Sequence, residues 1–404
     1  MERQFLPIVI VGHVDHGKST LIGRLLSDTG SLKEEGRQEI YESSNLLGKD
    51  VEYAFALDAL EEEREGGLTI DTTQACFQTD KRRYTLVDAP GHKEFLRNMI
   101  TGASYAQAAI LVIDVSEGVR EQTQRHAFLL HMAGIKQVIV ALNKMDLVHF
   151  EQGIFEDIEQ QIKGYFSNMS LFPTHYIPIS AKTGLNIVHN DHFISWYNGS
   201  SLLDALDTLE ITNRLQAAVR FPVQDVYQIA GENILVGRIE SGEIRKNMDV
   251  HILPSMEKCR IAHIMKFMQD DLRAASYGEV IGLIVEKCDQ VQRGDVLTGD
   301  PKARTTREFE ARIFWFGETY RKEAITIKHT TQSSTASMII HSKIDPALID
   351  HIIHDPEDIA IGEAANVTIA TDQPLIIDSF SEINEMGRFV IELNYVPVAC
   401  GIIL

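Results

Sequence analysis

The glycines Gly12 and Gly17 are separated by four residues and followed directly by Lys18 and Ser19. Glycines at this spacing let backbone N–H groups curl around phosphate oxygens, while the lysine reaches the terminal phosphates and the serine hydroxyl binds Mg²⁺. A helix that starts near Ser19 would point its positive end at the same anion. We therefore predict a phosphate-binding loop made of Gly12, His13, Val14, Asp15, His16, Gly17, Lys18, Ser19 and Thr20.

A second polar segment, VDAPGH, spans residues 87–92 and also follows an apolar run. The carboxylate of Asp88 can hold Mg²⁺ through water, as a second acidic anchor does in nucleotide-hydrolysing proteins with a phosphate loop. The backbone N–H of Gly91 can donate to a γ-phosphate. We expect Asp88 and Ser19 to serve the same metal ion, and Gly91 to add to phosphate binding.

The segments NKMD (residues 143–146) and ISAK (residues 179–182) indicate which base is bound. An aspartate at a strand end can accept hydrogen bonds from both the N1–H and the exocyclic amine of guanine, whereas adenine lacks this pair of donors. A backbone N–H of the ISAK segment can donate to the guanine O6. We predict GTP or GDP as the ligand, with guanine-binding residues Asn143, Lys144, Asp146, Ser180, Ala181 and Lys182.

The elements that position these motifs alternate between strand-like and helix-like patterns. Strand-like runs span residues 5–11, 82–88, 108–114, 137–143 and 174–180, and helical patterns span 18–30, 92–104, 121–134, 156–169 and 201–209. Such alternation predicts a parallel sheet with helices on both faces. Most of the strands are apolar throughout, as a sheet buried on both sides requires.

The pattern changes after residue 212. Short segments rich in Val and Ile are separated by glycine-containing turns, and convincing helical patterns disappear, which is typical of small antiparallel barrels. About 190 residues is too many for one small barrel, so we divide the region in two. We expect an α/β nucleotide-binding domain at 1–212, followed by all-β antiparallel barrel domains at 213–302 and 303–404.

Charge and cysteine usage restrict the class of protein. The net charge is −20, which argues against a bare electrostatic footprint on nucleic acid. The four cysteines show neither a CxxC pair nor metal-ligand spacing, so we expect a reduced, cytoplasmic protein. No apolar run reaches the ~18–20 residues of a membrane span. The histidine pairs HNDH and HIIH, at residues 189–192 and 351–354, have no third ligand at convincing spacing, and we predict no metal there.

The four blocks occur in the order and at the strand ends of a GTP-binding G domain. Within that class, EEEREGGLTID (residues 61–71) and DAPGHKEFLRNM (residues 88–99) resemble the translation-factor GTPases, which include elongation factors Tu and 1-alpha. The resemblance implies that Thr69 coordinates Mg²⁺ and senses the γ-phosphate, that His92 is catalytic because it positions the attacking water, and that Val14 and Leu68 form a hydrophobic gate around it. The family usually has isoleucine at Leu68, and glutamine or arginine at Gly66.

Several segments resemble more closely the GTPase subunit of the two-subunit bacterial ATP sulfurylase, or sulfate adenylyltransferase. They include KSTLIGRLLSDTGSL, NKMDLVHFEQGIFEDI and SWYNGSSLLDALDTLE. This resemblance implies a switch that couples GTP hydrolysis to adenylyl sulfate formation by a separate catalytic adenylyltransferase subunit in sulfate assimilation.

Two alternatives to the sulfurylase hypothesis stay open. The first is an elongation- or release-factor-like GTPase that carries aminoacyl-tRNA or acts at the ribosome. Asp15-His16 favours it, because GHVDHGK is the elongation-factor spelling, whereas the sulfurylase subunit usually has Asp-Asp here. The second is a GTP-binding scaffold that docks a partner through its barrels and has no coupled reaction.

Overall fold

The computed structural model divides the chain into two compact units, Met1–Ile211 (unit 1) and Thr212–Leu404 (unit 2). None of the helices in the described part of the chain has both the length and the apolar character that crossing a membrane requires. The structure describes residues 4–32, 53, 74–88, 106–167, 169, 171–190, 194–211, 217–229, 231–266, 269, 271–286, 288, 290–300, 303–348 and 351–404.

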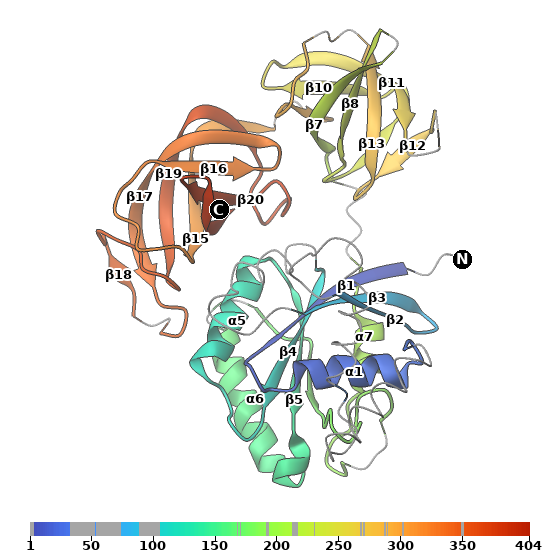
Figure 1. Ribbon diagram of the computed structural model, residues 1–404, viewed down its shortest axis with the longest axis vertical. Coiled ribbons are helices and arrows are strands. Elements are labelled where there is room, and N and C mark those ends of the chain that lie inside the picture. The colour runs from blue at the N-terminus through green and yellow to red at the C-terminus, as the bar shows by residue number, and fades with distance from the viewer. Residues whose placement is uncertain are drawn as a thin grey trace. The chain divides into compact units, whose positions relative to one another are not determined.

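Unit 1 is built on a six-stranded sheet with the order β2-β3-β1-β4-β5-β6. All neighbouring strands are parallel except β2, which runs antiparallel to β3 at one edge. The central β4 is buried at every position, because helices cover both faces of the sheet (Figure 1). The strands are β1 (Gln4–Gly12), β2 (Gln74–Gln78), β3 (Arg82–Asp88), β4 (Ala108–Asp114), β5 (Gln137–Asn143) and β6 (His175–Pro178).

The helices of unit 1 pack onto this sheet through apolar side chains. Leu21, Ile22 and Leu25 of α1 share one core with alternate residues of β1, β4 and β5 and with Leu202 and Leu206 of α7. Helix α5 also packs on the sheet, where it contacts β1 and β4. The helical elements are α1 (Lys18–Asp28), α5 (Glu121–Met132), the 3₁₀ helix η2 (Met145–Val148), α6 (Gln152–Ser167) and α7 (Leu202–Thr208).

Unit 2 begins with a closed antiparallel barrel whose strand order is β10-β11-β13-β8-β7-β14, beside a two-stranded ribbon of β9 and β12. Its core contains alternate side chains such as Phe221 and Val223 of β7 and Ile261 of β11. The strands are β7 (Arg220–Ile229), β8 (Glu232–Arg238), β9 (Glu243–Arg245), β10 (Asp249–Leu253), β11 (Glu257–Met265), β12 (Ala274–Ser276), β13 (Val280–Glu286) and β14 (Val296–Thr298).

The rest of unit 2 is a second antiparallel sheet with the order β16-β20-β21-β15-β19-β17-β18. Since β16 also pairs with β17, six of these strands close into a ring, and β18 is added outside it. Its core contains Trp315, Ile327 and Ile369. The strands are β15 (Arg304–Trp315), β16 (Ile325–His329), β17 (Gln332–Ile344), β18 (Ile353–His354), β19 (Ala364–Ile377), β20 (Arg388–Leu393) and β21 (Val396–Ile403).

The two β sheets of unit 2 are joined by a buried ion pair. Arg220 of β7 donates from Nε and Nη2 to the two carboxylate oxygens of Asp378, at 2.8 and 2.7 Å, and from Nη1 to Thr298 Oγ1 at 2.8 Å. An apolar cluster containing Val296 and Ile376 adds a dry contact between the same two sheets. Paired charge and apolar burial together hold the two sheets as one compact unit.

The fold class predicted from the sequence is confirmed: an α/β unit with a mostly parallel sheet precedes antiparallel β structure that includes a closed barrel. The five strand-like runs of the first half did not include β2, whose buried residues, Ala75 and Phe77, alternate with exposed ones. The run at 174–180 was placed too widely, because β6 begins after Thr174 and ends before Ile179. The division of unit 2 at residue 302 stays a prediction.

The expectation of four reduced cysteines is wrong for two of them. Cys259 of β11 and Cys288, which follows β13, form a disulfide. The pairing of β11 with β13 brings them together, since Arg260 lies opposite Glu286 and the two cysteine Cα atoms are 6.0 Å apart, a distance a disulfide spans. The two cysteines are 29 residues apart in the sequence, so their spacing gave no sign of the pairing. Cys76 and Cys400 are free, as expected.

Candidate nucleotide-binding site

The sheet topology gathers the predicted motifs at one edge. In the parallel strands β1, β3, β4, β5 and β6 the carboxyl ends all meet there, and β1 lies between β3 and β4 although it precedes both in the chain. The crevice at such a reversal of strand order is where open α/β sheets bind ligands. Gly12 lies opposite Val112, and Asp114 lies opposite Asn143, so the loops that follow these strands are neighbours.

Two glycines let the phosphate-binding loop follow its path. A Cβ atom on Gly12 would lie 2.4 Å from the backbone oxygen of Val112, and one on Gly17 would lie 2.5 Å from Nδ2 of Asn143. Gly17 also has a φ of 88°, a left-handed conformation that glycine adopts without strain. Gly12 is therefore required by the close approach of the Val112 backbone, and Gly17 by its left-handed conformation and the close Asn143 side chain.

The N-terminus of α1 is prepared for an anion. Its N-cap residue, Gly17, provides no side-chain hydrogen bond, and its first turn contains no acidic residue. The first backbone N–H groups of the helix therefore have neither a capping side chain nor an acidic residue of the first turn as a partner, and they point toward the loop. The hydroxyls of Ser19 and Thr20 belong to this first turn and are partly exposed.

Lys18 is the cation of this site. Its Nζ donates to the backbone oxygens of Gly12 and His13, at 2.8 and 2.9 Å, and the side chain is buried. Burial lowers the pKa of Lys18, while the carboxylates of Asp88 and Asp15 act in the opposite direction. That interaction places Asp88, at the end of β3, within electrostatic reach of the loop. A positive group held in an apolar setting is suited to phosphate.

Asn143 ties the phosphate-binding loop to the predicted base-binding loop. Its side chain is almost completely buried; Nδ2 donates to the backbone oxygen of His16 at 2.9 Å, and Oδ1 accepts from the backbone N–H of Ala181, also at 2.9 Å. One amide thus holds two loops that are far apart in the sequence. The geometry predicts that displacement of either loop disturbs the other.

Asp146 is held by the neighbouring loop. Ser180 donates its hydroxyl to Oδ1 of Asp146 at 2.6 Å, and the backbone N–H of Met145 donates to Ile179. Asp146 stays partly exposed, whereas Ser180 and Ala181 are buried and Lys182 is exposed. The structure therefore brings together the six residues predicted to bind guanine, with the carboxylate oriented before any base arrives.

Asp114, at the end of β4, belongs to the same edge but was missed by the sequence reasoning. It pairs with Lys144 at 2.7 Å and accepts from the backbone N–H and hydroxyl of Ser116. Burial alone would raise the pKa of Asp114, but Lys144 and Ser116 outweigh it and hold that pKa below its usual value. The available signal was an aspartate that ends an apolar strand and has a serine two residues later.

The remaining predicted residues lie outside the described part of the chain: Gly66, Leu68, Thr69, Gly91 and His92. Their roles in metal binding, gating, phosphate binding and water positioning therefore stay predictions. Val14, the other member of the predicted gate, is exposed on the phosphate-binding loop.

Comparison with known proteins gives the family. Residues 3–212 match the Elongation factor Tu GTP binding domain, residues 233–298 match Elongation factor Tu domain 2, and residues 308–404 match the GTP-eEF1A C-terminal domain-like family. The chain belongs to the translation-factor GTPases. It is a GTP-binding GTPase, and the predicted family resemblance is confirmed at this level.

Relatives along the whole chain are named elongation factor 1-alpha. The protein from Pyrococcus furiosus is 35% identical over 100% of this chain and 98% of its own length. The protein from Archaeoglobus fulgidus is 36% identical, again over 100% and 98%. The crystal structure of sup35 complexed with GDP covers 100% of this chain and 94% of that chain at 25% identity, but its TM-score of 0.45 is too low to support an argument.

These names favour the elongation-factor hypothesis over the ATP sulfurylase hypothesis. The relatives above do not support the expected closeness to a sulfurylase subunit, nor an adenylyltransferase partner. The GHVDHGK spelling of the phosphate-binding loop, which departs from the sulfurylase pattern at Asp15-His16, was therefore the better guide to kinship.

Proposed function

We propose that this chain is a GTP-hydrolysing switch of translation, of the elongation factor 1-alpha kind. Gly12–Thr20 would bind the phosphates, Asp146 with Ser180 and Ala181 would select guanine, and His92 would position the attacking water. Hydrolysis removes the γ-phosphate and its contacts, so the protein's affinity for a partner differs between the GTP and GDP states.

The observation that carries this proposal is the double hydrogen bond of Asn143. Because Asn143 bonds both His16 of the phosphate-binding loop and Ala181 of the base-binding loop, the two loops are held next to one another. A phosphate-binding loop alone would not select a base; its connection to Asp146 and Ser180 supports guanine.

Mg²⁺ fits the donor set. Oxygen ligands from a hydroxyl and a carboxylate, completed by water and phosphate, are what this ion prefers. Ser19 lies in the first turn of α1, and Asp88 lies within electrostatic reach of Lys18. We propose that Ser19 binds the ion directly, Asp88 through water, and Thr69 in the GTP state. When bound, Mg²⁺ would neutralise charge on the phosphates.

The finer proposal is that the GTP state carries aminoacyl-tRNA to the ribosome. It is supported by the names of the relatives, which match the chain over its full length. The net charge of −20 means that contacts with tRNA would come from local basic groups rather than from the whole surface. The sulfurylase hypothesis and the scaffold hypothesis then become outcomes of the test.

Nucleotide selection is tested with Asp146→Asn. Asparagine presents an amide donor where guanine also presents donors, so we expect GDP binding to weaken about a hundredfold or more. Xanthosine diphosphate has a carbonyl oxygen at that position and should bind the variant better than the wild type. The control is Asp157→Asn on α6, which is exposed. Unchanged GDP affinity in Asp146→Asn would refute guanine selection by Asp146.

The partner is tested by retention of aminoacyl-tRNA on the chain loaded with a non-hydrolysable GTP analogue or with GDP. We expect retention with the analogue only. The sulfurylase hypothesis would replace ours if the chain ignores aminoacyl-tRNA but GTP speeds adenylyl sulfate formation by an ATP-pyrophosphatase-type adenylyltransferase subunit. Guanine binding with neither effect would indicate a scaffold.

A further inference from the structure

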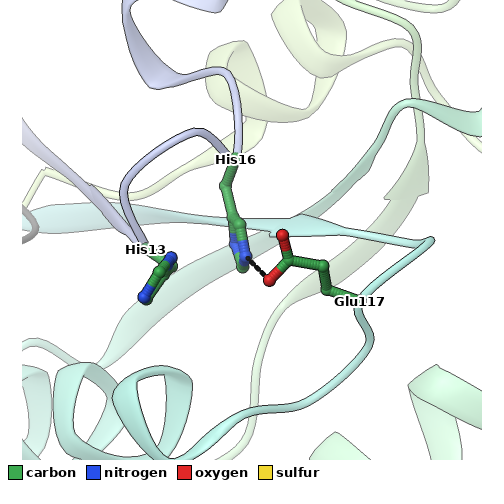
Figure 2. Close-up of side chains that lie close together, drawn as sticks. All are labelled: His13, His16 and Glu117. Carbon is green, nitrogen blue, oxygen red and sulfur yellow. Dashed lines mark ion pairs between the residues drawn. The ribbon is translucent and has the colours of Figure 1, made fainter.

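Two side chains of the phosphate-binding loop meet a third side chain from another part of unit 1. His13 and His16 come from the loop between β1 and α1, and Glu117 comes from the turn after β4 (Figure 2). Their ligand atoms all lie within 4.8 Å of one another. The His16 ring and the Glu117 carboxylate point toward each other in Figure 2.

His16 presents a buried nitrogen lone pair. The side chain is fully buried, and Nδ1 lies 3.2 Å from the backbone oxygen of Val112, which can only accept, so Nδ1 carries the proton. Burial lowers the pKa of His16 despite the hydrogen bond and the nearby carboxylate, which favours the neutral ring. Nε2 then has a lone pair but no hydrogen-bond partner among the described residues.

That lone pair faces a negative oxygen. His16 Nε2 lies 3.5 Å from Oε2 of Glu117. A neutral His16 and an ionised Glu117 present two acceptors to one another, and a metal ion between them would satisfy both atoms.

His13 is oriented in the same way. Its Nδ1 donates to the backbone oxygen of Val14 at 2.8 Å, which leaves Nε2 with the lone pair. Histidine ligands of metal ions in proteins have the same arrangement, in which one ring nitrogen donates to a carbonyl oxygen and the other binds the metal. Both rings of this cluster are therefore held as metal ligands are held.

We propose that His13, His16 and Glu117 bind a divalent transition metal ion of the Zn²⁺ class, with a fourth position open to water. Tetrahedral bonds of about 2.0–2.2 Å place ligand atoms roughly 3.3–3.6 Å apart, which matches the 3.5 Å between His16 and Glu117. The three ligand atoms lie within 4.8 Å of one another, and Glu117 is the exposed member of the cluster. Two imidazoles and a carboxylate suit Zn²⁺ rather than Mg²⁺, so this site is chemically distinct from the one proposed at Ser19 and Asp88.

The site goes beyond the proposed function and does not depend on it. Both histidines belong to the phosphate-binding loop, so a bound ion would fix the loop to the turn after β4. The carboxylate of Glu117 supplies negative charge that offsets the ion's repulsion of Lys18. Metal binding can be measured without any nucleotide, so its failure would leave guanine binding untouched.

The test is a Zn²⁺ titration of the full chain in nucleotide-free buffer, followed by calorimetry. The parent carries Cys76→Ser, because Cys76 is a free, exposed thiol and could bind Zn²⁺ by itself. We expect one site whose affinity falls at least tenfold in Glu117→Gln and in His13→Asn. The matched control is Glu121→Gln, an exposed carboxylate at the start of α5 that should leave the affinity unchanged.

Co²⁺ gives a second readout, since tetrahedral coordination by nitrogen and oxygen produces strong visible absorption that octahedral Co²⁺ lacks. We expect this absorption in the parent and its loss in Glu117→Gln. The proposal is overturned if the parent binds no Zn²⁺, or if Glu117→Gln and Glu121→Gln bind it equally well.

Discussion

His329 in unit 2 and His126 in unit 1 are both completely buried, yet their surroundings differ. His329 donates from Nε2 to Met386 at 2.7 Å and accepts at Nδ1 from Gln332 at 3.2 Å. Nδ1 of His126 has no hydrogen-bond partner among the described residues, and neither has Nε2 of His16 in the same region. Both nitrogens of His329 are thus satisfied by neighbouring groups, whereas His126 and His16 each keep a buried nitrogen without a hydrogen-bond partner among the described residues.

The cations of the two units show the same contrast. Arg220 donates from both Nε and Nη2 to the carboxylate of Asp378. Lys18 has hydrogen bonds to neutral backbone oxygens, with Asp88 and Asp15 interacting only through their charge. A cation whose bonded partners are neutral keeps its attraction for a phosphate. At these two cations, the one paired with a carboxylate joins two sheets, and the one bonded to neutral oxygens lies in the phosphate-binding loop.

We expect the largest change in the free energy of unfolding when the buried ion pair of unit 2 is broken. Asp378→Ala leaves the buried Arg220 without its partner and should destabilise unit 2 by about 3–5 kcal/mol. Denaturant unfolding followed by fluorescence measures this, because the chain has two tryptophans and only Trp315 lies in unit 2, so a Trp196→Phe background isolates it. The control Asp249→Ala removes an exposed pair with Arg260 and Lys258 and should change little. Equal losses in the two variants would contradict the contrast.

The next effect is a pH dependence of unit 1. Burial, together with the nearby Lys18, lowers the pKa of His126 to about 3. As the pH falls below the ordinary value of about 6.5, the unfolded chain binds a proton that the folded state does not, so stability is lost at about 1.4 kcal/mol per pH unit. Between pH 6.5 and 4.5 the loss should reach about 2.3 kcal/mol.

This slope is measured by Trp196 fluorescence in a Trp315→Phe background. His126→Gln cannot be protonated, so its stability should fall with pH less steeply by the same amount. The exposed His149→Gln serves as the control and should keep the parent slope. An unchanged slope in His126→Gln would show that other groups cause the acid sensitivity.

A smaller effect is expected at Asn143. Asn143→Ala leaves the backbone groups of His16 and Ala181 without their partner, so GDP binding should weaken by about 2 kcal/mol, or roughly thirtyfold. Asn143→Asp keeps the acceptor for Ala181 but places a buried carboxylate oxygen against the backbone oxygen of His16, so its loss should be at least as large. If both variants bind GDP like the parent, the two loops are not coupled through this amide.

The smallest effect concerns Ser180. Ser180→Ala removes one hydrogen bond to Asp146, worth about 1 kcal/mol, and should lower the preference for GDP over ADP severalfold. Ser167→Ala at the end of α6 is the control, because its hydroxyl bonds only its own helix. A preference that stays unchanged would mean that Asp146 needs no support from the neighbouring loop.

Much of the fold and of the candidate site in unit 1 could be predicted from the sequence, wherever the signal depends on residues close together in the chain. Continuous apolar runs predicted 82–88, 108–114 and 137–143, and these are the limits of β3, β4 and β5. The glycine and lysine spacing likewise predicted the phosphate-binding loop. Such patterns depend only on neighbours along the chain, and burial on both sides of a sheet leaves a clear one.

Contacts between distant segments could not be predicted. The pairing of Asp114 with Lys144 and the approach of Glu117 to His16 follow from strand order and register, which place Gly12 opposite Val112 and Asp114 opposite Asn143. A metal site was sought in HNDH and HIIH, where the histidines are close in sequence. The cluster that the structure brings together has its third ligand about a hundred residues away, so spacing alone could not reveal it.

The buried pair of Arg220 and Asp378 has a mechanical consequence. It lies where β7 and β14 of the barrel meet the end of β19 in the second sheet, and it is backed by the apolar contact of Val296 with Ile376. A pull applied to either sheet is therefore transmitted to the other. A partner that moves one sheet of unit 2 would therefore move the other sheet with it.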